Sequence, residues 1–325
     1  MSMRKIANKV ITLLYKTTQN YRIDRLDKIN LNKIELFKPT ADSNTFLCWN
    51  DLFEGYLIRD FPPKLTSILN GIIKIDQSLI TDFDFNKIQS LSASKSFGGM
   101  QEGHINGSWF DDLYHWGKGM YPDDNLKAEK IEDWNRNISH IEREGFPKYK
   151  PIDVIYYAWL DRYLAPNSGG SHHAAMVVYQ SIKDKLEYKR EVNLEHISLD
   201  ENYINALDND YYSFIIENDC TPDNKSTSES VKFIDLIRVI VSDQVYILKP
   251  VHYHQSLSII FISKQGLKIE HDLFVQWINS AHKKQKIIEL PTYFRSPKQY
   301  QTKPYLHALR FILLGNPRRV YSGEK

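Results

Sequence analysis

The segment "KPIDVIYYAWLDRYLAPNSGGSHHAAMVVYQSIKD" (150–184) contains the pattern that decides the fold of this chain. Its first part is rich in β-branched and aromatic residues, which favour strands, and it predicts a buried strand over residues 151–159. A loop follows, and then Gly169 and Gly170 precede an apolar run with helical spacing. We therefore expect a helix that begins within about two residues of Ser171.

The segments on either side extend this prediction. Residues 125–146 predict a helix that ends at Gly145, with an apolar face formed by Ile131, Trp134, Ile138 and Ile141. Later apolar runs predict strands over 231–241, 244–251, 256–263 and 286–290, and a helix over 269–284. Together these elements indicate an α+β fold, in which a mixed sheet has helices packed around it.

Changes in composition suggest how the chain is divided. Residues 218–230 are polar and almost free of apolar side chains, which predicts a loop. The expected regions are then an N-terminal α/β region (1–94), a central region (95–217), and a C-terminal region of strands and a basic helical segment (231–325). All of them could also belong to one domain.

The overall composition excludes several classes of protein. The chain has 325 residues, of which 42% are hydrophobic and 25% charged, as in globular proteins. Cys48 and Cys220 are the only cysteines, so neither a disulfide framework nor a zinc finger organises the fold. No apolar run is long enough for a membrane span. Abundant Lys, Asn and Ile indicate an AT-rich genome, and we expect a bacterial cytoplasmic protein.

The residues GGSHH (169–173) raise a functional hypothesis. Glycines allow the backbone to approach a phosphate, and a helix N-terminus offers free N–H groups and a partial positive charge. His172 and His173 could bind phosphate oxygens or act as acid and base near neutral pH. The alternative is structural, with a glycine turn, Ser171 as the helix cap and two surface histidines.

The order of elements around this box resembles the ParB/sulfiredoxin-like superfamily. In that superfamily a helix ending in Gly precedes a "PI.V" strand, and a short box then begins the next helix. The matching positions are Ile138, Gly145, Pro151, Ile152, Val154, Gly170, Ser171, His172, His173, Ala174 and Ala175. The resemblance covers about 60 residues, which would form a ParB/sulfiredoxin-like unit in the middle of the chain.

The resemblance implies that the box binds nucleotide phosphates. Members of the superfamily include CTP-hydrolysing partition proteins, ATP-dependent sulfiredoxins, serine kinases and proteins regarded as nucleases. It therefore implies a nucleoside triphosphate with Mg²⁺ as the ligand, held by Gly169, Gly170, Ser171, His172 and His173. Two positions depart from the pattern. His173 replaces the arginine of the box, and Ser171 replaces the sulfiredoxin cysteine, which excludes sulfinic-acid repair.

Two carboxylates near the predicted strand are further catalytic candidates. Glu144 and Asp153 could serve as a general base or as a metal ligand, although a solvated surface is the ordinary role for such residues. His252 and His254 form an H-x-H pair that can bind metal, but no third ligand follows from the sequence. The metal site therefore remains unassigned.

The C-terminal segment, residues 283–325, is basic. Ten Lys and Arg residues stand against two Glu residues, which gives a net charge of +8. Basic and aromatic side chains alternate there, as in proteins that bind single-stranded nucleic acid, and an amphipathic helix is the alternative. The residues that would contact DNA or RNA are Arg295, Lys298, Lys303, Arg318 and Arg319.

Three functional hypotheses follow. The first is a nucleotide-binding protein, with an NTPase or a phosphotransferase as the corresponding enzyme. The second is a DNA- or RNA-binding protein or a nuclease that uses the basic segment. The third is a non-catalytic interaction protein in which the box only caps a helix. The oligomeric state does not follow from the sequence.

Overall fold

A computed structural model describes residues 18–34, 60–91, 112–120, 125–158, 161–217, 228–248 and 257–296. These residues form two compact units, each of which is described by itself below. One unit contains the described residues of 18–34, 60–72 and 201–295, and the other contains those of 73–200. The boundaries near 94 and 217 and the single-domain alternative stay predictions from composition, whereas this division groups segments that are far apart in the chain.

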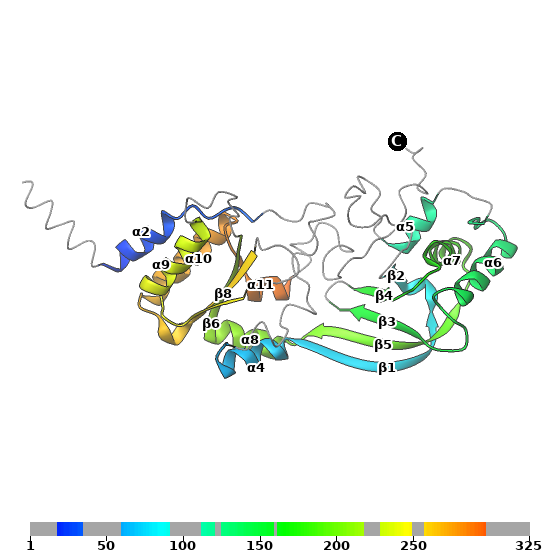
Figure 1. The fold of residues 1–325 in the computed structure, drawn as a ribbon, viewed down its shortest axis with the longest axis horizontal. Helices are drawn as coiled ribbons and strands as arrows, with labels where there is room; N and C mark the ends of the chain where they lie inside the picture. Colours follow the sequence, from blue (N-terminus) through cyan, green and yellow to red (C-terminus); the bar gives the residue numbers. More distant parts are fainter. Residues whose placement is uncertain are drawn as a thin grey trace, which may run out of the picture. The chain divides into compact units, whose positions relative to one another are not determined.

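The unit of residues 73–200 is built on a five-stranded mixed sheet (Figure 1). The order is β1-β5-β3-β4-β2, with antiparallel pairs β1/β5 and β3/β4 and parallel pairs β3/β5 and β2/β4. Its strands are β1 (Ile73–Asp84), β2 (Ile88–Leu91), β3 (Ile152–Tyr157), β4 (Arg162–Ala165) and β5 (Lys189–Leu199). The predicted α+β class with a mixed sheet is therefore confirmed.

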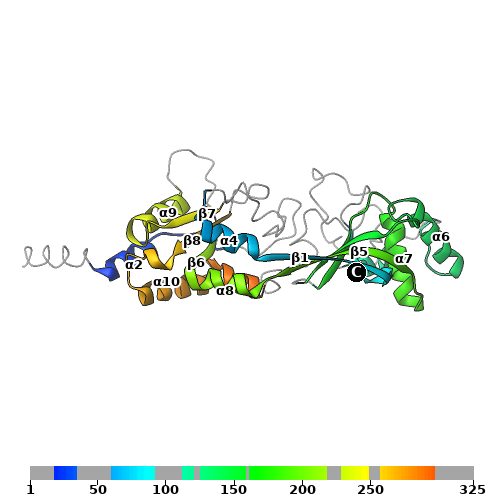
Figure 2. The ribbon, with the colours of Figure 1, turned by 90° about the horizontal axis from the view of Figure 1, so that it is seen from below.

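Helices of this unit lie on one side of the sheet (Figures 1 and 2). They are α5 (Leu113–Lys118), α6 (Ile131–Arg143) and α7 (Ser171–Asp184), and a short 3-10 helix η1 (Phe85–Lys87) joins β1 to β2. α7 packs against both α5 and α6. The contact with α5 is close, because a Cβ atom on Gly117 would lie 2.4 Å from the carbonyl oxygen of Ala175.

The buried face of α6 differs from the predicted one. Trp134 and Ile141 are buried as expected, but Ile131 is 51% exposed, and the polar side chains of Asp133 and Asn137 are buried instead. The two polar residues face inward because they bind backbone groups of the segment that leads into the helix. The 3-4-3 spacing of apolar residues thus predicted the position of the helix correctly, but it predicted the buried face only in part.

The other unit contains a four-stranded antiparallel sheet in the order β7-β8-β6-β9. Its strands are β6 (Tyr211–Glu217), β7 (Val245–Leu248), β8 (Leu257–Ser263) and β9 (Ile288–Glu289). Its helices are α2 (Gln19–Asp27), α4 (Pro63–Gly71), α8 (Glu201–Asp210), α9 (Glu229–Ile240), α10 (His271–Lys283) and α11 (Leu290–Arg295), with η3 (Lys264–Gly266) after β8. In Figure 1, α2, α9 and α10 lie on one side of the sheet, and α4, α8 and α11 on the other.

An aromatic cluster fills the core between this sheet and helices α9 and α10. The ring centroids of Phe233 and Trp277 are 5.4 Å apart, and those of Phe274 and Trp277 are 5.6 Å apart with nearly parallel planes. Phe214 of β6 contacts both Phe233 and Trp277. Burial of these large apolar surfaces stabilises the unit.

Most of the elements predicted for this unit are confirmed, but one is wrong. The run 231–241 was predicted as a strand and forms α9. Its β-branched residues fit either structure, whereas its buried positions, among them Phe233, Ile237 and Ile240, recur with helical spacing. The Ser228 hydroxyl accepts a hydrogen bond from the N–H of Val231 and caps the helix.

Candidate functional site

The box begins a helix as predicted, but its cap is a different residue. α7 starts at Ser171, and Gly170 is the N-cap, with a φ of +70° that favours glycine. Ser171 was expected to cap the helix; it is instead buried in the first turn. The Asn167 side chain holds the turn, because its Nδ2 donates to the Ser171 hydroxyl (2.8 Å) and to the Gly169 carbonyl (3.0 Å).

Two glycine turns touch each other through their backbones. A Cβ atom on Gly170 would lie 2.4 Å from the carbonyl oxygen of Glu144, and one on Gly145 would lie 2.4 Å from that of Gly169. Real Cβ contacts do not come this close, so both positions require glycine. The space beside the Cα atom of Gly170 is thus filled by the end of α6.

The two histidines of the box point to different helices. The ring of His172 lies 5.2 Å from the ring of Trp116 in α5, measured between centroids. His173 faces α6, where its Nδ1 is 2.8 Å from Oδ1 of Asn137. Adjacent residues of a helix are about 100° apart around its axis, so the two imidazoles have different surroundings.

The Asn137 side chain fixes the tautomer of His173. Its Nδ2 donates to the carbonyl oxygen of Lys127 (3.0 Å), which can only accept, and this bond sets the orientation of the amide. Oδ1 therefore accepts from His173, and the ring proton resides on Nδ1. Nε2 of His173 then carries the lone pair, and it makes no hydrogen bond to a described residue.

A second histidine stacks on this ring. The centroids of His140 and His173 are 3.6 Å apart, with an angle of 23° between the planes. Nε2 of His140 lies 3.3 Å from Oε2 of Glu144. Burial, and after it the neighbouring His140, His172 and Arg136, lower the pKa of His173 to about 4, against a smaller opposing effect of the Glu144 carboxylate. His173 is thus a neutral base at pH 7, not the cation that would replace the arginine of the box.

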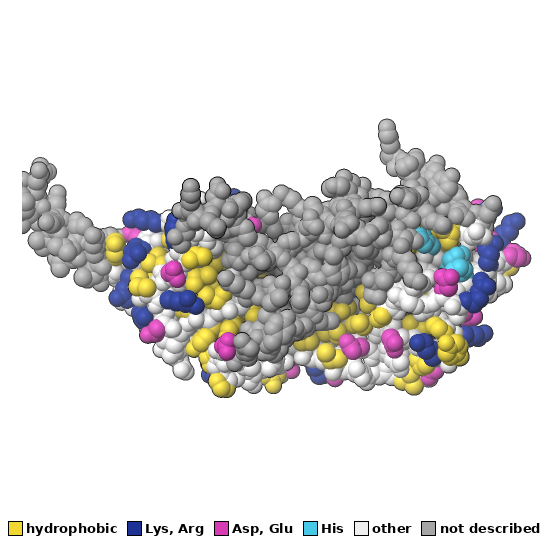
Figure 3. All heavy atoms as spheres, viewed as in Figure 1, with side chains coloured by type: hydrophobic (Ala, Val, Ile, Leu, Met, Phe, Trp, Pro, Cys, Tyr) yellow, Lys and Arg dark blue, Asp and Glu magenta, His cyan; other side chains and the backbone are white. Residues whose placement is uncertain are grey.

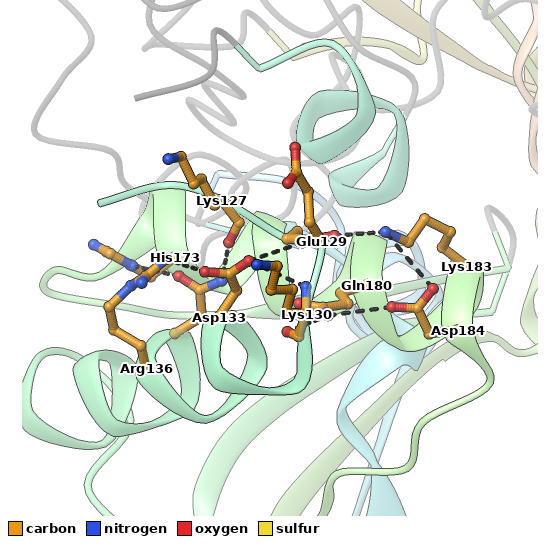
Figure 4. Close-up of polar contacts among 11 residues, drawn as sticks. Lys127, Glu129, Lys130, Asp133, Arg136, His173, Gln180, Lys183 and Asp184 are labelled. Carbon is orange, nitrogen blue, oxygen red and sulfur yellow. Dashed lines mark hydrogen bonds and ion pairs between the residues drawn. The ribbon is translucent and has the colours of Figure 1, made fainter. Parts of the chain in front are cut away.

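A network of polar contacts holds α6 and α7 in this arrangement (Figure 4). Asp133 accepts from the backbone N–H of Glu129 and of Lys130 at 3.1 Å each, and from the guanidinium of Arg136 at 2.7 Å. Burial acts to raise the pKa of Asp133, but these hydrogen bonds outweigh it and lower the pKa. Gln180 of α7 donates to the Lys130 carbonyl (2.9 Å), which ties the same segment to the second helix.

The exposed surface over these two helices carries both basic and acidic side chains (Figure 3). Figure 3 shows histidine side chains beside Lys and Arg side chains in this area. In Figure 4 the side chains of Arg136 and His173 lie close together. The Arg136 side chain is about two-fifths exposed, so it can reach a ligand in solvent while it remains paired with Asp133.

Of the two predicted carboxylates, one belongs to this cluster. Glu144 ends α6 and lies beside His140, as described above. Asp153 lies on an exposed position of β3, where it accepts a hydrogen bond from Asn193 of β5 (3.0 Å), away from the cluster. The sequence prediction missed Asn137 and His140. Their spacing with Glu144 on one face of the predicted helix was the signal that could have indicated them.

The predicted nucleic-acid residues lie mostly outside the described residues, as do His252 and His254. Lys298, Lys303, Arg318 and Arg319 all belong to this group. Arg295, at the end of α11, donates to Glu201 (2.8 Å), Asp208 (3.0 Å) and Asn205 (2.7 Å) of α8. These acidic partners neutralise the one predicted cation that the structure describes.

Two kinds of feature are absent from the part of the chain that the structure describes. It contains no group of three or more His, Cys, Asp or Glu side chains arranged to hold a metal ion. It also contains no helix with the length and apolar character that a bilayer span requires.

Comparison with known proteins relates part of the chain to a family model. Residues 122–271 match a family of unknown function (DUF6685). The match includes α6, β3, β4 and α7, and therefore the whole His140–His173 cluster. No curated protein and no solved structure matches the chain.

Proposed function

We propose that the chain binds a nucleoside triphosphate at the start of α7 and acts on it as a nucleotide-dependent hydrolase or phosphotransferase. The observation that supports this most is the Asn137–His173 pair, which keeps a neutral imidazole whose Nε2 lone pair has no hydrogen-bond partner among the described residues. A base that is unprotonated at pH 7 and held by a second residue is typical of catalytic sites. The resemblance to the ParB/sulfiredoxin-like superfamily is the reason for choosing a nucleotide among phosphorylated ligands.

In the proposed reaction, His173 serves as the general base. Its Nε2 takes the proton of a water molecule, or of an acceptor hydroxyl, as the oxygen attacks the terminal phosphorus and the bond to the bridging oxygen breaks. Arg136 and the N–H groups of the first turn of α7 stabilise the negative charge of the phosphates. His140, between the base and Glu144, positions the His173 ring by stacking.

Mg²⁺ would accompany the triphosphate, as the resemblance implies. Mg²⁺ in nucleotide sites is commonly held by one or two carboxylates together with phosphate oxygens. Glu144 is the carboxylate of this cluster that fits such a role, and the ion would neutralise charge on the phosphates. The cytoplasmic location remains a prediction, as does binding of DNA or RNA.

The test is the release of inorganic phosphate from a panel of nucleoside triphosphates with Mg²⁺. His173→Gln should lower kcat by about 10²- to 10⁴-fold, because general-base catalysis contributes that much, while the nucleotide Kd stays within a few-fold. His271→Gln is the control, since it removes an exposed histidine of α10 in the other unit. Equal turnover in the His173 variant, or neither binding nor hydrolysis of any nucleotide, contradicts the proposal.

A further inference from the structure

A cavity lies on the side of α7 opposite His173. It has a volume of about 350 Å³, and its walls come from the η1–β2 segment, α5, β4 and the middle of α7. Ile182 lines it and lies nine residues after His173, which places the two side chains about 180° apart around the helix axis. The cavity is therefore separate from the proposed phosphate site.

Two tyrosine rings form walls of the cavity, and one of them is firmly held. Tyr163 contacts the Phe83 ring at 5.4 Å and the Tyr156 ring at 4.5 Å between centroids. Tyr114, on α5, contacts Tyr179 at 5.8 Å. Ile182 is 45% exposed, so it supplies an apolar surface that the described residues leave open. Pockets of this size with aromatic walls are typical sites for small ligands.

Carboxylates supply the charge of the cavity. Asp161 has a φ of +53°, which is uncommon for a residue other than glycine, and its Oδ1 accepts from the Tyr156 hydroxyl at 2.8 Å. Asp112 accepts from the backbone N–H and the Nδ1 of His115, both through Oδ1. Among the described residues, Oδ2 of each carboxylate has no hydrogen-bond partner. Among the described residues of the lining, Lys87 is the cation, so two negative charges and one positive charge give a net charge of −1.

We infer that this cavity binds a small organic amine, as its cation. The ammonium group would pair with Asp161 and Asp112 and lie against the tyrosine rings, which attract cations through their π faces. The apolar part of the ligand would cover Ile182. An anion of the same size would meet two carboxylates and bind less well.

The test is a titration with three ligands of one shape and different charge: phenethylamine, phenethyl alcohol and phenylacetate. The amine should bind most tightly and phenylacetate least. Asp161→Asn should weaken phenethylamine about tenfold or more and leave phenethyl alcohol unchanged, because it removes only the charge. Asparagine also tolerates the positive φ of this position. Asp153→Asn, on the exposed face of β3, is the matched control.

Asp112→Asn provides a second variant, because asparagine also caps a helix and α5 should remain intact. It should weaken phenethylamine as Asp161→Asn does. The inference is overturned if the three ligands bind equally, if none binds at about 10 mM, or if Asp153→Asn has the same effect as the two cavity variants. If Asp161→Asn does not fold, the three-ligand series and Asp112→Asn still test the inference.

Discussion

The two units of the chain bury different kinds of side chain. In the unit of residues 201–295, the described buried polar side chains are serines alone, around an aromatic core. In the unit of residues 73–200, buried polar residues include Asp133, Asn137, Gln180, Arg162 and Arg190. Buried amides and charges destabilise a core unless they are fully hydrogen-bonded, so they indicate positions under another constraint. The difference supports the proposal that the chemistry belongs to the unit of residues 73–200, whereas apolar packing dominates the other unit.

The largest effect should come from the apolar core. Phe274→Ala removes a fully buried ring that stacks on Trp277, and it should destabilise its unit by about 3–5 kcal/mol. Chemical denaturation followed by Trp fluorescence measures the loss. The NMR signals of His173 in the folded protein should not move. A shift of those signals would contradict the distinction between the two units, because the surroundings of His173 would then depend on the aromatic core.

A smaller but more local effect should come from the glycine turns. Gly170→Ala places a Cβ on the carbonyl oxygen of Glu144 and keeps a positive φ, so it should destabilise the unit of residues 73–200 by about 2–3 kcal/mol. Gly169→Ala is the control, because its Cβ would meet only the Glu144 side chain, at 3.4 Å. Thermal unfolding compares the two variants. Similar melting temperatures would show that the turns do not pack as described.

For the unit of residues 73–200, the sequence predicted the elements that carry the candidate site but not the contacts within it. The β-branched run before residue 158 and the glycines before Ser171 are local signals, and they located β3 and the start of α7. The contacts of Gly145 with Gly169 and of Gly170 with Glu144 join residues far apart in the chain, so no local pattern contains them. Asn137 is polar, and a polar residue on a predicted helix suggests a solvated face, whereas this one is completely buried.

The pH dependence of stability should differ between the units. The pKa of His173 is about 4 in the folded chain and about 6.5 when unfolded, so the unfolded chain binds the proton more readily. Its stabilising contribution is present above pH 6.5 and is lost as the pH falls towards 4. We expect a loss of about 1–2 kcal/mol, reduced from the full shift because the ring is only partly buried.

Hydrogen exchange at pH 7 and pH 4.5 locates this effect. Protection should fall in α6 and α7 more than in α10. In His173→Gln, whose amide can still donate to Asn137, that additional loss should disappear. A variant that loses protection in α6 and α7 as the parent does would assign the pH effect to other groups.

The most direct test of the central claim is an NMR titration of the His173 ring nitrogens in the ligand-free chain. The account predicts a proton on Nδ1, an unprotonated Nε2 at pH 7 and a pKa near 4. His271 of α10 provides an internal reference for an exposed histidine. A proton on Nε2, or a pKa near the ordinary value of about 6.5, would contradict the assignment of His173 as a neutral base.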